Sequence, residues 1–227
     1  MIKLDFLGKD SVRFCKKVNV HKNVYENLQN FIKNKSKKEE LFDLINSSGL
    51  NEYLNSFLDG LTAKVWRTYN ASFTFQKELE KLVSSKKIDS FTEPEERLNY
   101  LIAVFNQANT EVALLCNHQK AVTPNLDKTI DKIDERIKEL KKKKDKYIDS
   151  KDKAKKIDNK IKLLKIKKES KNKMKNVSLG TSKQNYIDPR IIFAFIKKFN
   201  IPPEKLFTST LLTRFQWASI VEADYKF

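Results

Sequence analysis

The sequence predicts a mainly α-helical protein with one β-hairpin at its N-terminus, and three observations support this fold class. First, residues 1–20 place apolar side chains on either side of a Gly-Lys-Asp turn, which is typical of two paired strands. Second, apolar residues from about 22 to 117 follow a helical pattern. Third, residues 127–176 form two lysine-rich stretches with a narrow apolar seam, which is typical of an antiparallel helical hairpin.

The helical body divides into shorter predicted helices. The segment 38–49, KEELFDLINSSG, is predicted to be a short helix that its Ser-Ser-Gly sequence ends. The segments 50–60 and 61–82 continue the helical pattern. The segment 93–118 carries Pro94 and acidic residues in its first turn, which suits the N-terminus of a helix.

The lysine-rich segment has the same 3-4-3 apolar spacing on both of its stretches. The seam positions are Ile130, Ile133, Ile137 and Leu140, then Ala154, Ile157, Ile161 and Leu164. After Gly180 the composition becomes globular again, and 188–200 is predicted to be a helix with Pro189 in its first turn. Two more short helical pieces follow, so the lysine-rich hairpin connects two packed parts of the chain.

The net charge of +17 over 227 residues indicates a polyanionic partner, nucleic acid before a membrane surface. Residues 127–176 hold 21 Lys and Arg against 10 Asp and Glu, so +11 of that charge lies there. The alternative is codon bias, because lysine outnumbers arginine 40 to 6. The hairpin is therefore either a solvated coiled coil or an arm that lies along a nucleic-acid backbone.

The cysteines and the apolar runs indicate a soluble intracellular protein. Cys15 and Cys116 are the only cysteines, and they form neither a disulfide framework nor a CxxC motif. No apolar run approaches the roughly 20 residues of a membrane span. The first residues lack the apolar region of a signal peptide.

Several kinds of chemistry are disfavoured by missing motifs. The sequence has no metal-ligand spacing, no phosphate-cradling glycine loop and no GxSxG elbow. The side chains that remain are Lys9, Arg67, His118 and Tyr186. Each has a structural alternative: a solvated turn lysine, a partly buried arginine paired with a carboxylate, a capping histidine and a half-buried aromatic.

Together these four side chains fit the transfer of a phosphodiester. Arginine and histidine can neutralise the charge on the non-bridging oxygens, and a tyrosine hydroxyl can be a covalent nucleophile. A lysine can protonate the departing alkoxide as a general acid. This chemistry needs no metal ion, ATP or other cofactor.

Five strings carry a resemblance to a known family. FLGKDSVRF, LTAKVWRTYNAS, ANTEVALLCNHQKA, GTSKQNYIDPR and the closing WASIVEADYKF occur in the order found in eukaryotic type IB DNA topoisomerases. The resemblance covers essentially the whole chain and is loosest in the lysine-rich hairpin. It implies the DNA breaking-rejoining enzyme fold, with double-stranded DNA as the partner and no membrane or small-molecule substrate.

The resemblance implies a role for each of the four side chains. Tyr186 matches the nucleophile of the SKxxY motif, and Arg67 matches the catalytic arginine, with Trp66 in place of the usual phenylalanine. His118 matches the histidine of the CNHQ motif, and Lys9 matches the lysine of the LGKDS hairpin. Tyr186 is expected to form a 3′-phosphotyrosine, Arg67 and His118 to bind the non-bridging oxygens, and Lys9 to protonate the leaving 5′ oxygen.

Further implications concern DNA contacts and domains. The family's DNA contacts map onto Asp10, Lys64, Thr181 and Asn185. The expected domains are the C-terminal part of the catalytic core (1–122), a coiled-coil linker that leaves the body (123–177) and a C-terminal domain (178–227). The linker is expected to slow strand rotation and is shorter than usual in the family. Family membership and basic clusters such as KKKKDK predict a nuclear location.

The family also has a catalytic arginine and a large lobe upstream of the LGKDS hairpin. Arg13 lies beyond Lys9, so it does not match that arginine. Residues 1–227 alone are therefore expected to be inactive or nearly so, as a truncated gene product, a pseudogene fragment or one subunit of a split enzyme. The alternatives are a DNA-binding fragment without chemistry and a tyrosine recombinase, against which the LTAKVWRTYNAS string and the charged hairpin argue.

Overall fold

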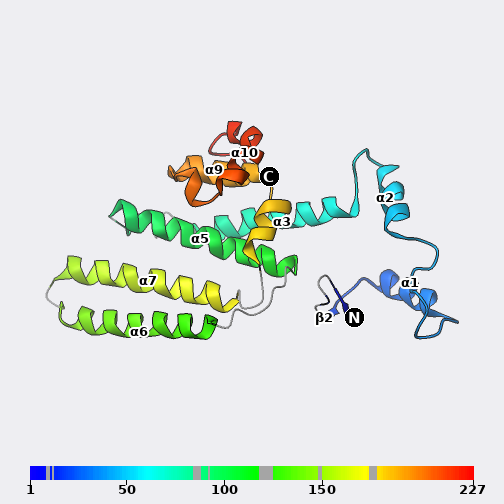
Figure 1. The fold of residues 1–227 in the computed structure, drawn as a ribbon, viewed down its shortest axis with the longest axis horizontal. Helices are drawn as coiled ribbons and strands as arrows, with labels where there is room; N and C mark the ends of the chain where they lie inside the picture. The colour runs from blue at the N-terminus through cyan, green and yellow to red at the C-terminus, as the bar shows by residue number, and fades with distance from the viewer. Residues whose placement is uncertain are drawn as a thin grey trace. The chain divides into compact units, whose positions relative to one another are not determined.

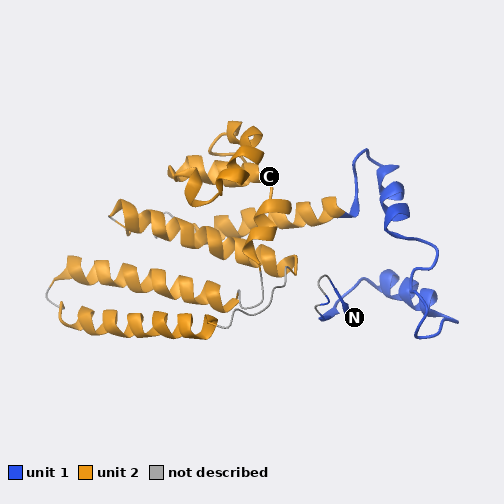
Figure 2. Cartoon of the chain, viewed as in Figure 1, with its two compact units in different colours: residues 1–63 blue, residues 64–227 orange. Residues whose placement is uncertain are grey.

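The computed structural model describes residues 1–8, 11, 13–83, 88–91, 93–117, 125–147, 150–173 and 178–227. These residues form two compact units, 1–63 and 64–227, which Figure 2 shows in different colours. Helices predominate over the one two-stranded sheet of the described residues, which confirms the predicted mainly α fold class (Figure 1). Across the described parts of the chain, none of the helices combines the length and apolar character that a membrane crossing requires.

The predicted N-terminal hairpin is confirmed. β1 (Ile2–Leu7) pairs antiparallel with β2 (Arg13–Val18). On one face the Asp5 carboxylate accepts hydrogen bonds from the Arg13 guanidinium at 2.8 and 2.9 Å. Contacts of this kind between strands stabilise the register of a sheet that has little buried surface.

The helix predicted over 38–49 is wrong. After α1 (Lys22–Ile32) the chain runs without a helix or strand, and α2 (Ser47–Asn55) begins where the predicted helix was to end. The reason is Asn46, whose side chain accepts a hydrogen bond from the Gly49 backbone N–H at 2.9 Å and caps the helix start. The Ser-Ser-Gly sequence therefore forms the first turn of a helix and not the last.

The second unit contains the predicted longer helices. They are α3 (Ala63–Leu82), α5 (Pro94–Leu115) and α9 (Pro189–Phe199). The short helix α8 (Leu179–Asn185), which precedes α9, was not predicted from the sequence. Pro94 and Pro189 each open a helix, where the missing N–H of proline costs no hydrogen bond. Three short elements complete the C-terminal part: η2 (Pro203–Lys205), α10 (Ser209–Arg214) and η3 (Gln216–Ile220).

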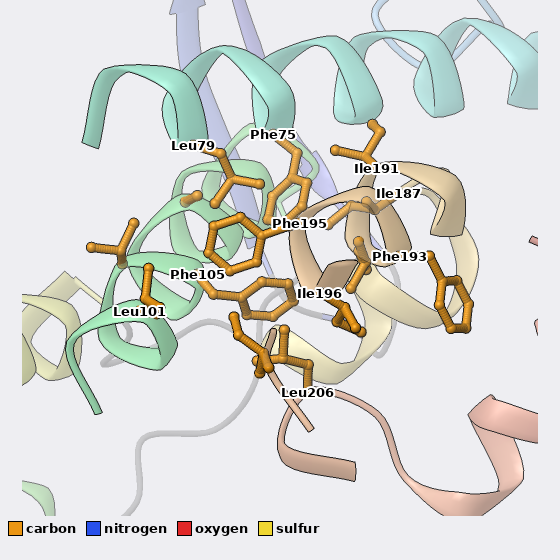
Figure 3. Packing of buried hydrophobic residues seen from close by; sticks show 14 of the residues in the cluster. Phe75, Leu79, Leu101, Phe105, Ile187, Ile191, Phe193, Phe195, Ile196 and Leu206 are labelled. Atoms are coloured by element: carbon orange, nitrogen blue, oxygen red, sulfur yellow. The ribbon is translucent and has the colours of Figure 1, made fainter. Parts of the chain in front are cut away.

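The core of the second unit forms where α3, α5 and α9 pack together (Figure 3). The rings of Phe75 and Phe105 meet nearly edge to face, with centroids 5.3 Å apart. The ring centroid of Phe105 also lies 6.1 Å from that of Phe195 on α9. Fully burying one such ring contributes about 1.5–3 kcal/mol. This packing holds the helix that contains position 67 against the segment that follows position 186.

The predicted helical hairpin is also confirmed. α6 (Leu126–Asp145) and α7 (Lys151–Lys173) pack through a cluster built on Ile137, Leu140 and Ile161. The other seam positions that pack against this cluster are Ile133, Ile157 and Leu164. An ion pair at 2.6 Å between Asp134, early in α6, and Lys168, late in α7, fits the antiparallel arrangement.

The packing of α7 differs from the expected single seam and from an arm that leaves the body. Leu163, between two seam positions, is buried in the core of the second unit. The Asn159 side-chain amide donates to the Ser90 carbonyl at 3.1 Å, and Lys173 pairs with Glu111 of α5 at 2.7 Å. One face of α7 therefore packs on α6 while another packs on α5.

Candidate active site

Tyr186 lies directly after α8, at the point where the chain turns toward α9. Its backbone N–H and that of Ile187 both donate to the Ser182 carbonyl, at 2.9 and 3.0 Å. Ile187 is buried in the core, and the Tyr186 side chain packs partly buried against the same core. The helix end therefore anchors the tyrosine backbone while part of the side chain faces solvent.

Arg67 lies in the second turn of α3, and its guanidinium contacts the tyrosine. Arg67 Nη1 donates to the Tyr186 hydroxyl oxygen at 3.4 Å, and the guanidinium carbon lies 5.4 Å from the ring centroid. The Lys64 ammonium, one turn earlier on the same helix, lies 5.9 Å from that centroid. Two cations from one helix thus lie near one phenol ring.

The partial burial expected for Arg67 is wrong. The residue is exposed, because its bulky neighbours do not cover it. Val65, Trp66 and Tyr69 are themselves 41%, 55% and 52% exposed. The guanidinium is therefore open to an anion that approaches from solvent.

Ser72, also on α3, binds both sides of the tyrosine turn. Its hydroxyl accepts a hydrogen bond from the Asp188 N–H at 2.9 Å and donates to the Tyr186 carbonyl at 3.3 Å. Ser72 is fully buried. No sequence pattern marks this serine as functional, although it is the last residue of the LTAKVWRTYNAS string.

The Thr181 and Asn185 side chains lie one turn apart on α8. Asn185 donates from its side-chain amide to the Thr181 carbonyl at 3.2 Å, and the Thr181 hydroxyl bonds the Ser178 hydroxyl at 3.4 Å. Asn185 is exposed and Thr181 is half-buried. Both side chains belong to the short helix that leads into Tyr186.

Lys183, the lysine of the SKQNY string, contacts residues of the core. Its ammonium donates to the Leu206 carbonyl and lies 5.8 Å from the ring centroids of Phe105 and Phe207. Burial lowers the pKa of the Lys183 ammonium below its ordinary value. No sequence pattern indicated a role for this lysine, and the structure shows it binding α8 to the C-terminal elements.

Lys9, Asp10 and His118 lie outside the described residues. The end of α5 gives one related observation at Cys116, two residues before His118. Burial raises the pKa of the Cys116 thiol, and the Arg67 charge acts on it in the opposite direction. The described chain thus comes within electrostatic range of Arg67 shortly before position 118.

This arrangement has a definite chemical capability. A phenol oxygen can attack phosphorus, and an exposed guanidinium beside it can bind the phosphoryl oxygens in the transition state. The helical fold and this pair together define a centre suited to tyrosine-dependent phosphoryl transfer.

Comparisons with known proteins give the family. Residues 1–153 match the family model of the eukaryotic DNA topoisomerase I catalytic core, and residues 158–227 match the C-terminal topoisomerase domain. The chain therefore belongs to the eukaryotic type IB DNA topoisomerase family.

Individual relatives agree with this assignment. The chain is 43% identical over 230 residues to DNA topoisomerase 1 of Caenorhabditis elegans, covering 96% of this chain and 27% of that protein. It is 38% identical over 251 residues to the Homo sapiens protein of that name, covering 100% and 32%. Identity to the mitochondrial DNA topoisomerase I of Rattus norvegicus is 36% over 240 residues, covering 96% and 39%. The chain thus spans well under half the length of these curated relatives.

Proposed function

We propose that this chain carries the cleavage and religation centre of a type IB DNA topoisomerase, with Tyr186 as the nucleophile. The observation that supports this most directly is the 3.4 Å contact between Arg67 Nη1 and the Tyr186 hydroxyl. It joins two residues that are 119 positions apart, and both match the family's catalytic motifs.

The proposed reaction exchanges one phosphate ester for another. The Tyr186 oxygen loses its proton and bonds to phosphorus, while the bond from phosphorus to the 5′ oxygen of DNA breaks. Lys9 supplies a proton to that leaving oxygen. The products are a 3′-phosphotyrosine and a free 5′-hydroxyl, which reverses the reaction after the strand has rotated and supercoils have relaxed. Because an ester bond is kept throughout, religation needs neither a metal ion nor ATP.

Arg67 and His118 are the proposed ligands of the non-bridging oxygens. Arg67 is exposed beside the phenol, so a phosphate placed for attack by Tyr186 also meets its guanidinium. For His118 the support is its match to the histidine of the family's CNHQ motif. Charge neutralisation by such donors is typically the largest contribution to this kind of catalysis.

Double-stranded DNA is the proposed partner, and four residues are proposed to hold it near the phenol. Lys64 lies one helical turn from Arg67, while Thr181 and Asn185 lie on the helix that ends at Tyr186. Asp10 is the fourth. The net charge of +17 supports general attraction to the phosphate backbone.

We also retain the three-part organisation as a proposal: core 1–122, linker 123–177 and C-terminal domain 178–227. The linker is proposed to restrain strand rotation through the excess positive charge of α6 and α7. A nuclear location is proposed from family membership, although one relative is mitochondrial.

Residues 1–227 lack a match to the family's upstream arginine. Removing one comparable oxyanion donor lowers a rate by about 10²–10³. We therefore expect these residues alone to cleave DNA very slowly, and to gain rate from a polypeptide that carries the upstream segment of a related enzyme.

The test uses a nicked duplex that traps the covalent intermediate, incubated in EDTA and run on a denaturing gel. The chain is assayed alone and with the added upstream segment, and DNA binding is measured in parallel. A covalent adduct in the mixture supports the proposed function. DNA binding with no adduct in either sample would instead favour a fragment that holds DNA without cutting it.

A further inference from the structure

Ser72 links the helix that carries Arg67 to the turn that carries Tyr186. It lies on α3, five residues after Arg67, yet its hydroxyl bonds the backbone at residues 186 and 188, more than a hundred positions away. Ser72 is completely buried. A serine hydroxyl can donate one hydrogen bond and also accept. Ser72 does both, with the Tyr186 carbonyl as its acceptor and the Asp188 N–H as its donor.

The two peptide groups that Ser72 binds flank Ile187. The Tyr186 carbonyl follows the last turn of α8, and the Asp188 N–H precedes the first turn of α9. Ser72 therefore bonds the backbone on both sides of Ile187. Removing the hydroxyl from such partly buried peptide groups is costly.

Other contacts constrain this turn less specifically. Burial of Ile187 restricts how far the turn can move from the core, but apolar burial is non-directional. The bonds from Ser182 are local to α8 and move with it. The Ser72 bonds are directional and come from the helix that also carries Arg67, so they act on the spacing between the guanidinium and the phenol.

We propose that Ser72 is a positioning residue for the nucleophile: through the backbone on either side of Ile187, it holds Tyr186 at contact distance from Arg67. The expected effect of Ser72 on the rate of adduct formation rests on the proposed function. Its effect on the orientation of the Tyr186 ring does not, and can be measured without DNA.

The first test is spectroscopic and uses the chain of residues 1–227 without DNA. Ring resonances of ¹³C-labelled tyrosine are recorded, and Tyr186→Phe identifies the signal of Tyr186. Ser72→Ala removes both bonds and adds no bulk, so the Tyr186 signal is expected to shift or broaden and the Asp188 amide to exchange faster with solvent. An unchanged signal and unchanged exchange would overturn the proposal.

The matched control is Thr110→Val. Thr110 is also completely buried, but its hydroxyl donates only to the Asn106 carbonyl of its own helix, at 2.8 Å. This variant is expected to leave the Tyr186 signal in place. If it moves that signal as much as Ser72→Ala does, the effect is general loosening of the core and the positioning role is wrong.

The second test measures adduct formation at saturating DNA, with the upstream segment added. Ser72→Ala is expected to lower the rate by about 10²-fold, the cost of a misplacement of about 1 Å, and to leave DNA affinity unchanged. A rate equal to that of Thr110→Val would contradict the catalytic consequence. If the unsubstituted chain forms no adduct, the proposed function fails, while the spectroscopic test still decides whether Ser72 orients Tyr186.

Discussion

Arg67 and Tyr186 contact each other through both the polar and the aromatic parts of the phenol. The Arg67 guanidinium donates to the hydroxyl oxygen at 3.4 Å, and its carbon lies over the ring, 5.4 Å from the centroid. A distance of 3.4 Å is at the weak end for such a bond. Under the proposed function, a phosphate can therefore displace this weak contact at little cost and bind the guanidinium through its own oxygens.

The first prediction concerns Arg67. Replacing it with alanine removes the guanidinium beside the phenol, so the rate of adduct formation should fall by about 10²–10³. The rate is measured at saturating DNA with the upstream segment present. Arg214→Ala is the control, because it removes the same charge from an exposed residue that contacts the Phe215 ring. Equal losses in both variants would show that total charge, and not the Arg67 contact, determines the rate.

The second prediction concerns Lys64. If this exposed lysine binds a DNA phosphate, Lys64→Ala should weaken binding to all sequences and reduce the salt dependence of binding by about one ion. The slope of log affinity against log salt measures this directly. Lys205→Ala, on the short helix η2, serves as a charge-matched control. A slope identical to that of the unsubstituted chain would contradict a phosphate contact at Lys64.

The third prediction follows from the burial of Lys183. Because its pKa is lowered in the folded state, the unfolded chain binds more protons between that lowered pKa and the ordinary lysine pKa of about 10.4. The contribution of Lys183 to stability therefore rises with pH across that window. The unfolding free energy of the unsubstituted chain, minus that of Lys183→Met, should increase as pH rises toward about 10.4. A difference that stays flat or falls would show that the ammonium is not desolvated.

The fourth prediction separates the two faces of α7 with neighbouring leucines. Leu163 is buried in the core of the second unit, whereas Leu164 is half-buried against α6. Leu163→Ala should lower the unfolding free energy by about 2–5 kcal/mol, and Leu164→Ala should lower it less. Urea denaturation gives both values, and hydrogen exchange should show loss of protection in α5 for Leu163→Ala only. The same exchange pattern in both variants would mean that α7 does not pack on α5.

The sequence predicts most of the fold because its local signals agree with the packing. The hairpin and the helices after Pro94 and Pro189 follow from side-chain alternation and proline position. The helix prediction for 38–49 failed because Ser-Ser-Gly was interpreted as the end of a helix. In the structure Asn46 caps the helix that begins there. The second face of α7 was missed because Leu163, although it directly precedes the seam residue Leu164, falls outside the repeating 3-4-3 spacing.

The site is less predictable from local pattern. Residue spacing does not bring position 67 to position 186. Side-chain chemistry grouped the two residues, and the family resemblance then assigned them to one site. Ser72 gave no signal, because a small hydroxyl residue inside a helix has no periodic pattern that marks it. Its role depends on a contact between segments more than a hundred residues apart.

The most direct test of the central claim is to map the covalent bond itself. The adduct formed on the nicked duplex with the upstream segment present is digested with protease, and the DNA-linked peptide is identified by mass spectrometry. We predict that the DNA is joined through a 3′-phosphate to Tyr186, that the released strand carries a 5′-hydroxyl, and that Tyr186→Phe gives no adduct. Attachment at another residue, or an adduct that persists in Tyr186→Phe, would contradict it.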